Sequence, residues 1–312
     1  MFPLHLVPHD TKIQFMVFHR VAFTLSSILA VISVAAFLVF GLNYGIDFKG
    51  GTLIEIKTLN GPAEISELRD IISTANVGDT EIQEFGAPDE ILIRIEQQPG
   101  GEQAQQAVIA RVKEVLGDTV DYRRVEVVGP KVSSELAQTG AIAVIAAIFA
   151  VLVYIWFRFE WQFAVGAIAA LVHDVLLTIG LFSILQLEFG LSIIAAILTI
   201  VGYSLNDTVV VYDRVRENLR RYKKLPLREL LDNSINQTLS RTVLTSITTL
   251  IALFSLYIFG GEVIRGFTFA MIWGVFVGTY SSIFIAAPFL TILGTKRDWS
   301  KNADTGPGTR TA

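Results

Sequence analysis

The sequence has no cysteine and few charged residues. Only 17% of its 312 residues are charged, whereas a water-soluble protein usually carries about a quarter. Without cysteine the chain cannot form a disulfide scaffold, a thiolate metal site or a cysteine nucleophile. It also shows no phosphate-binding loop, no metal-ligand spacing and no nucleophile–base arrangement. We therefore expect no enzyme, no ATPase, and no bound cofactor or metal.

Long hydrophobic runs take the place of the missing charge. Hydrophobic residues make up 52% of the chain, and its mean hydropathy is +0.54. A bilayer core needs about 20 apolar residues in a helix. Six runs qualify: 21–40, 136–157, 161–187, 189–212, 242–259 and 264–293. The fold class predicted is a polytopic α-helical membrane protein with six transmembrane helices, which excludes a soluble enzyme, a disordered chain and a nucleic-acid binder.

The lysine and arginine residues predict the orientation of these spans. If the N-terminus is cytoplasmic, 15 of them fall in the inner segments 1–20, 158–160, 213–241 and 294–312, and only Arg265 falls in a short outer loop. Short inner loops carry the excess of positive charge in membrane proteins. We therefore expect cytoplasmic termini, a cytoplasmic loop 213–241, and an extracytoplasmic (periplasmic) segment 41–135.

Segment 41–135 is the only long stretch able to form a soluble domain. Strands are expected at 52–59, 81–85, 90–96 and 120–128, where apolar residues alternate or run together. Two amphipathic helices are expected, one opened by Pro62 and one at 102–116. The order β-α-β-β-α-β is typical of a ferredoxin-like α+β domain. This domain would carry a net charge of −8, and the rest of the chain +4.

Ionisable residues inside the predicted spans need a reason, because each costs at least about 2.5–3.5 kcal/mol in the hydrocarbon. His173 and Asp174 lie near the middle of the third span, Asn206 and Asp207 lie in the fourth, and Arg241 begins the fifth. Hydroxyl residues follow Arg241 along the fifth span: Thr242, Thr245, Ser246, Thr248 and Thr249. Two interpretations stay open here. Asp207 and Arg241 form a structural ion pair, or the group lines a proton or cation path.

Two further patterns concern packing. Gly274 and Gly278 form a Gly-x-x-x-Gly motif, which permits close contact between helices. After Pro226, apolar residues recur on one helical face between 227 and 239. This face is expected to be covered within the chain, or else to serve as an interfacial or docking helix.

Four segments carry distinctive residue patterns. Residues 44–51 read Tyr-Gly-Ile-Asp-Phe-Lys-Gly-Gly and 128–136 read Val-Gly-Pro-Lys-Val-Ser-Ser-Glu-Leu. Residues 202–218 begin Gly-Tyr-Ser-Leu-Asn-Asp-Thr, and 240–246 read Ser-Arg-Thr-Val-Leu-Thr-Ser. Together with the six spans and the insert, these segments resemble the SecD/SecF family over nearly the whole chain. Outside the membrane-embedded residues already named, the matching motif positions are Gly45, Asp47, Phe48, Gly50, Gly51, Gly129, Pro130, Asp213 and Arg214.

The resemblance implies one half of an RND-like (resistance–nodulation–division) membrane unit in the bacterial inner membrane. Such a unit pairs with SecD, joins the SecYEG channel, often with YajC, and uses the proton-motive force to draw emerging preproteins outward. The resemblance also implies that Asp207 is the carboxylate tied to proton coupling and Arg241 its arginine. His173 and Asp174 match a recurrent pair whose role is less defined. A structural scaffold and a lipid or small-molecule exporter half remain alternatives, as do H⁺ and Na⁺ for the coupling ion.

Overall fold

The computed structural model describes residues 8, 11–59 and 61–294 of the chain. Among these residues, six helical segments are long and apolar enough to cross a membrane, which confirms the predicted fold class. They are α1 (His19–Phe40), α5 (Pro130–Arg158), α6 (Trp161–Leu185), α7 (Leu191–Arg221), α8 (Leu227–Phe259) and the segment formed by α9 (Glu262–Ser281), a π-helical turn (Ser282–Ala286) and α10 (Ala287–Leu293). The predictions for 1–7, 9–10 and 295–312 lie outside the described residues.

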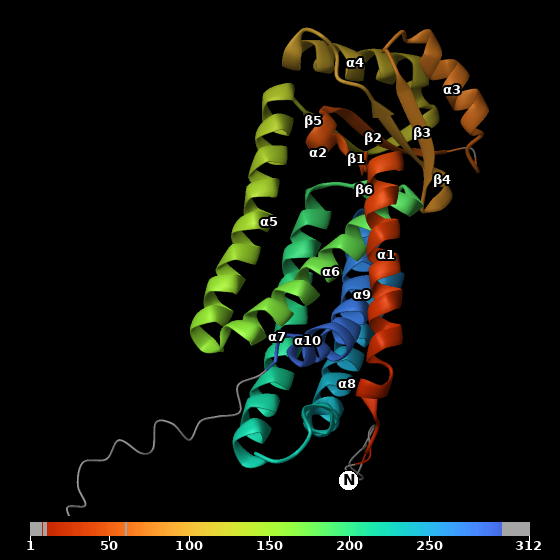
Figure 1. The fold of residues 1–312 in the computed structure, drawn as a ribbon. Coiled ribbons are helices and arrows are strands. Elements are labelled where there is room, and N and C mark those ends of the chain that lie inside the picture. Colours follow the sequence, from red (N-terminus) through yellow and green to blue (C-terminus); the bar gives the residue numbers. More distant parts are fainter. Residues whose placement is uncertain (1–7, 9–10, 60, 295–312) are drawn as a thin grey trace, which may run out of the picture.

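The six segments differ sharply in burial. In the most apolar stretch of α6, α7 and α9–α10, 56%, 44% and 61% of the residues are buried, against 17%, 11% and 17% for α1, α5 and α8. The first three form the centre of the bundle, and α5 stands at its edge (Figure 1). Each intramembrane acid lies on one of the central helices.

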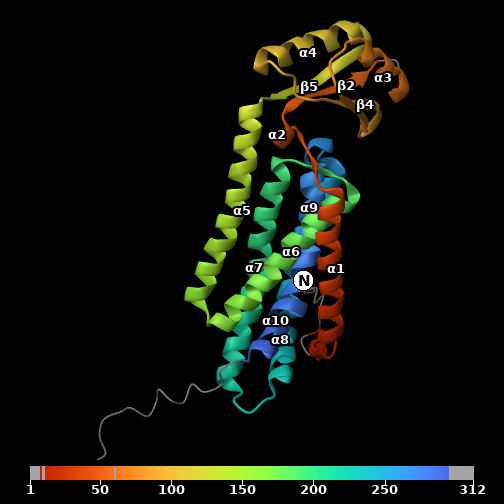
Figure 2. The same cartoon turned by 45° about the horizontal axis from the view of Figure 1, so that its top comes forward.

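Between α1 and α5 the chain forms a sheet domain (residues 43–128), which lies beyond one end of the bundle (Figures 1 and 2). Its elements are α2 (Ile46–Lys49), β2 (Gly51–Thr58), α3 (Ile65–Thr74), β3 (Thr80–Phe85), β4 (Ala87–Ile95), α4 (Gly101–Leu116) and β5 (Val120–Val128). The strand order is β3-β4-β2-β5, and every neighbouring pair is antiparallel. This topology is the split β-α-β arrangement that the order of elements predicted.

The two faces of the sheet have different roles because side chains alternate along a strand. Ile54 and Ile56 of β2 are fully buried beneath α3 and α4, which cover the face away from the bundle (Figure 2). Leu53 of β2 and Leu92 of β4 pack with Ile46 in a smaller cluster on the other face. The second face therefore joins the sheet to the segment that leads out of α1.

Several predicted boundaries were wrong, and three of them affect how the elements connect. Helix α3 begins at Ile65 rather than at Pro62, because the segment before it lies along the sheet and the Ala63 N–H bonds the carbonyl of Pro88. Helix α5 begins at Pro130, six residues before the predicted span. The predicted loop 213–241 is mostly helical, and only 222–226 connect α7 to α8.

The apolar face after Pro226 explains why residues 227–241 belong to helix α8. Leu230, Leu231 and Ile235 are at most 1% exposed and pack within the chain. The prediction that this face is covered within the chain is confirmed. Burial keeps α8 helical below the apolar span. The same end of the bundle holds the segment before α1, where the Met16 N–H donates to Asp232 Oδ1 at 2.8 Å.

Candidate functional site

Asp174 is the centre of a hydrogen-bonded cluster that joins three helices. Its side chain is 1% exposed. Its Oδ2 accepts hydrogen bonds from Ser204 Oγ of α7 at 2.6 Å and from Ser281 Oγ of α9 at 2.8 Å. Its Oδ1 lies 3.0 Å from Nδ1 of His173. Both carboxylate oxygens therefore have partners, which is the arrangement that a buried polar group requires.

His173 is the outer member of this cluster. Its ring is 6.2 Å from that of Tyr280, and its Nε2 is buried without a hydrogen-bond partner. Ser281, which bonds Asp174, is the last residue of α9 and is followed directly by the π-helical turn. Such turns are rare and are frequent at functional sites. The turn here begins directly after the serine that bonds the buried acid.

Asp207 is buried as deeply as Asp174 but lacks comparable partners. It is 2% exposed, and its Oδ2 is buried with no hydrogen-bond partner. Arg241 is near enough to interact with it electrostatically. However, no ion pair within 4.0 Å joins the two among the described side chains, and Arg241 is exposed. The structural ion pair considered from the sequence is therefore not formed. Asn206 is also exposed.

Hydroxyl groups from α7, α8 and α9 meet on the side of α7 that carries Asp207. Tyr203 Oη, one helical turn before Asp207, donates to Ser246 Oγ at 3.3 Å, and Ser246 Oγ lies 2.8 Å from Thr279 Oγ1. The Thr242 hydroxyl is buried without a partner. By contrast, Thr245 and Thr248 bond carbonyls of their own helix. The hydroxyl-rich face of α8 thus takes part in contacts between helices mainly through Ser246.

The Gly-x-x-x-Gly motif brings α9 close to α7. A Cβ atom at Gly274 would lie 2.2 Å from a side-chain atom of Ile200, and one at Gly278 would lie 3.0 Å from Cβ of Ser204. The close helix contact predicted from the motif is confirmed. It also lets Ser281 on α9 and Ser204 on α7 reach the same carboxylate oxygen.

The motif that follows α1 fastens the sheet domain to the start of α7. Asp47 Oδ2 accepts the backbone N–H of Leu191, the first residue of α7, at 2.7 Å. The Gly45 N–H bonds the carbonyl of Phe189 at 3.1 Å. Two-residue strands, β1 (Asn43–Tyr44) and β6 (Glu188–Phe189), pair in parallel there. A carboxylate at this position caps a helix N-terminus and favours its dipole.

Aromatic and charged contacts reinforce this junction. The ring of Phe48 lies 6.2 Å from that of Phe189. A Cβ at Gly45 would lie 2.6 Å from Glu188 Oε1, so a side chain at this position would displace the Glu188 carboxylate. Glu188 also forms a 2.9 Å ion pair with Arg94 of β4. The loop between α6 and α7 is therefore held by both the motif and the sheet.

Gly50 and Gly51 let the chain pass between two strands of the sheet. Their φ angles are +74° and +120°, which L side chains rarely adopt. A Cβ on Gly51 would lie 2.5 Å from the carbonyl oxygen of Ile95. At the other end of the domain, Gly129 precedes α5 and Pro130 is its first residue, a position that suits proline.

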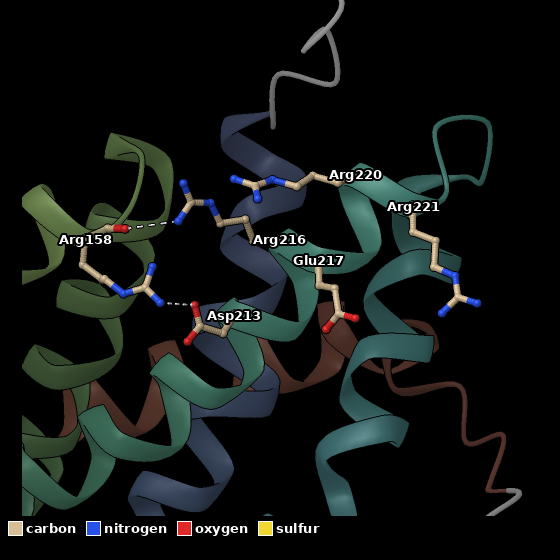
Figure 3. Close-up of a pocket in the computed structure, with 6 residues that line it drawn as sticks. All are labelled: Arg158, Asp213, Arg216, Glu217, Arg220 and Arg221. Carbon is tan, nitrogen blue, oxygen red and sulfur yellow. Dashed lines mark hydrogen bonds and ion pairs between the residues drawn. The ribbon is translucent and has the colours of Figure 1, made fainter.

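Asp213 and Arg214 lie on α7 beyond the predicted span. Asp213 pairs with Arg158, the last residue of α5, at 2.9 Å (Figure 3). Arg214 pairs with Glu217 at 2.9 Å. Neither touches the buried acids, and the helix continues beyond them to Arg221.

No group of three or more His, Asp or Glu side chains placed to hold a metal occurs in residues 8, 11–59 and 61–294.

The model of the family described as "Protein export membrane protein SecD/SecF, C-terminal" matches residues 107–296, and the "SecD/SecF GG Motif" matches residues 35–58. The chain belongs to the SecD/SecF family. The GG motif contains Gly50 and Gly51, and its match overlaps the junction described above.

Similar proteins are found within this family. The protein translocase subunit SecF of Rhodobacter capsulatus is 45% identical over 96% of this chain and 94% of its own length. The protein translocase subunit SecDF of Brucella abortus is 46% identical over 94% of this chain but only 39% of its own length. The crystal structure of SecDF, a translocon-associated membrane protein from Thermus, has a TM-score of 0.83 at 35% identity, covering 92% of this chain and 39% of that chain. This member of the SecD/SecF family thus spans less than half the length of these two SecDF relatives.

Several residues of the site were missed in the sequence. Ser204 and Ser281 bond Asp174, and Tyr203 and Thr279 join the hydroxyl contacts of Ser246. Ser204 and Tyr203 could have been found, because they lie within one helical turn of Asp207 in the quoted motif. Ser281 and Thr279 carry no such signal.

Proposed function

We propose that this SecD/SecF family member is a protein-export subunit that pairs with SecD. In this proposal the pair joins the SecYEG channel, with YajC, and uses the proton-motive force to promote late translocation of preproteins across the bacterial inner membrane. The Brucella and Thermus relatives support the pairing, because this chain matches 39% of each. A SecD partner would supply a second membrane unit.

The proposed orientation places the sheet domain in the periplasm and both termini in the cytoplasm. Basic residues support it: residues 214–228 contain seven lysines and arginines against one acid. The connection 222–226 and the segment before α1 both lie at the end of the bundle away from the sheet domain (Figure 1). The positive-inside rule assigns such an end to the cytoplasm.

We further propose that Asp207 is the group that takes up and releases the proton. The observation that carries this proposal is its buried carboxylate oxygen without a partner. A buried ionised carboxylate is costly unless it is paired. When ionised, Asp207 would draw Arg241 or water toward it, and when protonated it would release them. The charge state of Asp207 would therefore change how α7 and α8 pack.

Helix α7 provides the connection to the sheet domain. Asp207 lies on α7, and the first residue of the same helix is bonded to Asp47 of the sheet domain. A shift or tilt of α7 would therefore move the junction that holds the domain. One proton crossing 100 mV supplies about 2.3 kcal/mol, which matches the 1–3 kcal/mol typical of coupling between two sites.

In this scheme the Asp174 cluster holds the central helices together. Its carboxylate is already bonded to α7 and α9, so moving it would break several hydrogen bonds at once. It would serve as the fixed point around which α8 and the ends of α7 move. His173, at the edge of the cluster, would remain with Asp174 rather than relay protons.

The test compares Asp207→Asn with native protein in inner-membrane vesicles that contain the partner subunits. The variant should assemble normally and keep ATP-driven export. The stimulation of export by an imposed proton gradient should fall about tenfold or more, because a single group carries the coupling in this proposal. Glu229→Gln is the matched control: it makes the same carboxylate-to-amide change at an exposed position of α8 and should behave as native.

Full gradient-dependent stimulation in Asp207→Asn would contradict the coupling role. That result would instead favour a scaffold that stabilises the translocon without using the gradient.

A further inference from the structure

A cleft of about 610 Å³ opens at the end of α7 away from the sheet domain. Figure 3 shows the side chains that line it: Arg158, Asp213, Arg216, Glu217, Arg220 and Arg221. The lining therefore contains four guanidinium groups and two carboxylates, which leaves a formal net charge of +2. The coupling scheme gives this cleft no role.

Both acids of the cleft are already engaged with arginines. Asp213 Oδ1 pairs with Arg158 at 2.9 Å, and Glu217 Oε2 pairs at 2.9 Å with Arg214, which does not line the cleft. Arg216 has weaker partners. Its Nη1 donates to the carbonyl of Arg158 at 3.4 Å, and its Nε is buried without an acceptor. Arg216 thus has an unsatisfied donor beside the cleft, and the lining carries excess positive charge, which suits an anion.

The surroundings of the cleft indicate what kind of anion fits. Arg158 ends α5, and the two residues before it, Trp156 and Phe157, are 62% and 86% exposed. Trp161, which begins α6, is 49% exposed. Exposed tryptophans at the end of a membrane helix lie in the headgroup layer. The cleft therefore opens where an apolar helix surface meets the membrane–water interface.

We propose that this cleft binds the phosphate headgroup of an anionic phospholipid, with the acyl chains along the exposed side of α5. Arginine suits this ligand because its planar fork of donors matches phosphate oxygens. Basic pockets between transmembrane helices on the cytoplasmic side commonly bind anionic headgroups. A soluble anion would use the arginines but not the apolar surface beside them. The proposal relies on the proposed orientation only for the choice of leaflet.

A bound lipid would connect two parts of the bundle that are otherwise held by few contacts. Helix α5 has only 11% of its apolar stretch buried, and its end reaches α7 through the Arg158–Asp213 pair. A phosphate between Arg158 and Arg216 would strengthen this link on the helix that carries Asp207.

The experiment measures lipid retention by the purified full-length chain with native mass spectrometry. The probes are phosphatidylglycerol and phosphatidylcholine, which differ in net charge. The native chain should retain phosphatidylglycerol in preference. In the variant Arg158→Gln/Arg216→Gln/Arg220→Gln, the ratio of retained phosphatidylglycerol to phosphatidylcholine should fall about tenfold. The reason is that losing one hydrogen bond to a charged group weakens binding by roughly that factor.

The matched control is Lys223→Gln/Lys224→Gln/Arg228→Gln, which removes the same charge at the same end of the bundle but outside the cleft lining. It should keep the native preference. An equal loss in both triple variants would show general attraction to a basic surface and overturn the site. If the first triple variant does not fold, Arg216→Gln alone should still lower the preference severalfold, and no change in it would equally overturn the site.

Inorganic phosphate distinguishes the two sources of the anion. Millimolar phosphate should leave the retained phosphatidylglycerol in place, because the ion lacks the apolar contacts. Complete displacement would mean a site for free phosphate and contradict the lipid. None of these measurements involves export, so their failure would be distinct from a failure of the proposed proton coupling.

Discussion

Asp174 and Asp207 are almost equally buried, at 1% and 2% exposure, but their surroundings are opposite. Asp174 accepts hydrogen bonds from α7 and α9 and lies beside His173. Asp207 has a buried oxygen with no hydrogen-bond partner. Burial alone therefore does not distinguish a structural acid from a coupling acid.

The contrast shows which acid can change its charge at low structural cost. Neutralising Asp174 affects two serines and a histidine on three helices. Within residues 8, 11–59 and 61–294, by contrast, no side-chain hydrogen bond of Asp207 would be broken by neutralising it. A group that is protonated and deprotonated in each cycle should be of the second kind. We therefore propose that Asp174 supports stability and Asp207 supports coupling, and the predictions below test that division.

The largest effect on stability is expected from Asp174→Ala. It should lower the free energy of unfolding by about 2–4 kcal/mol, because hydrogen bonds to a charged group are worth about 1.5–3 kcal/mol each and bonds within membrane bundles are often weaker. Unfolding in mixed micelles measures it. Asp207→Asn should leave the same quantity unchanged or raise it, because it removes a carboxylate that is buried without a hydrogen-bond partner on Oδ2. A reversed order of the two would refute the division.

Packing around the cluster is tested by Gly278→Leu. Its side chain would meet Ser204 and force α9 away from α7, with an expected loss of about 1–3 kcal/mol. Gly202→Leu is the matched control, because a Cβ atom at Gly202 on α7 would meet no other atom within 4 Å. The control should be neutral or slightly stabilising, since leucine favours a helix over glycine. Similar losses in both variants would contradict the proposed contact.

The junction with the sheet domain is tested by Asp47→Ala. Loss of the cap should destabilise the first turn of α7 by about 0.5–2 kcal/mol. The Leu191 N–H donates a hydrogen bond to Asp47. Its hydrogen exchange should become faster in the variant, while the core of the sheet domain stays protected. Asp70→Ala, at an exposed position of α3, serves as the control. Unchanged exchange at Leu191 would show that the cap does not hold the helix.

The smallest effect is expected from Ser204→Ala. It removes one of the donors to Asp174 and should cost about 0.6 kcal/mol, the average for hydrogen bonds between transmembrane helices, and no more than about 1.7 kcal/mol. Ser255→Ala removes a hydroxyl that bonds only its own helix on an exposed face, and it should produce no measurable change. If both variants lose the same stability, the serine-to-aspartate bond adds nothing.

Much of the fold could be predicted because its signals are local. The six spans follow from the length of the apolar runs, and β5 was predicted at its observed residues, 120–128. The strand expected at 52–59 is observed as β2, Gly51–Thr58, and its Ile54 and Ile56 are fully buried. The extent of α8 was underestimated because the helical face after Pro226 was expected to be separate from the fifth span, which was predicted to begin at 242, whereas one continuous helix runs from Leu227 to Phe259.

The site was only partly predictable because it depends on contacts between distant segments. The sequence singled out Asp174 and Asp207 by their cost in a membrane, but it could not tell which one is bonded. That depends on the rotation of α6, α7 and α9 about their axes, and Ser281 lies 107 residues from Asp174. The contact between Asp47 and Leu191 spans 144 residues and likewise has no local signal.

The most direct measurement is proton flux through the chain assembled with its SecD partner in sealed vesicles under an imposed pH gradient. Native protein, Asp207→Asn and Glu229→Gln are compared at equal reconstituted amounts. The account predicts flux for the native protein and for Glu229→Gln, and none for Asp207→Asn. Equal flux in all three would contradict the assignment of Asp207 as the coupling acid.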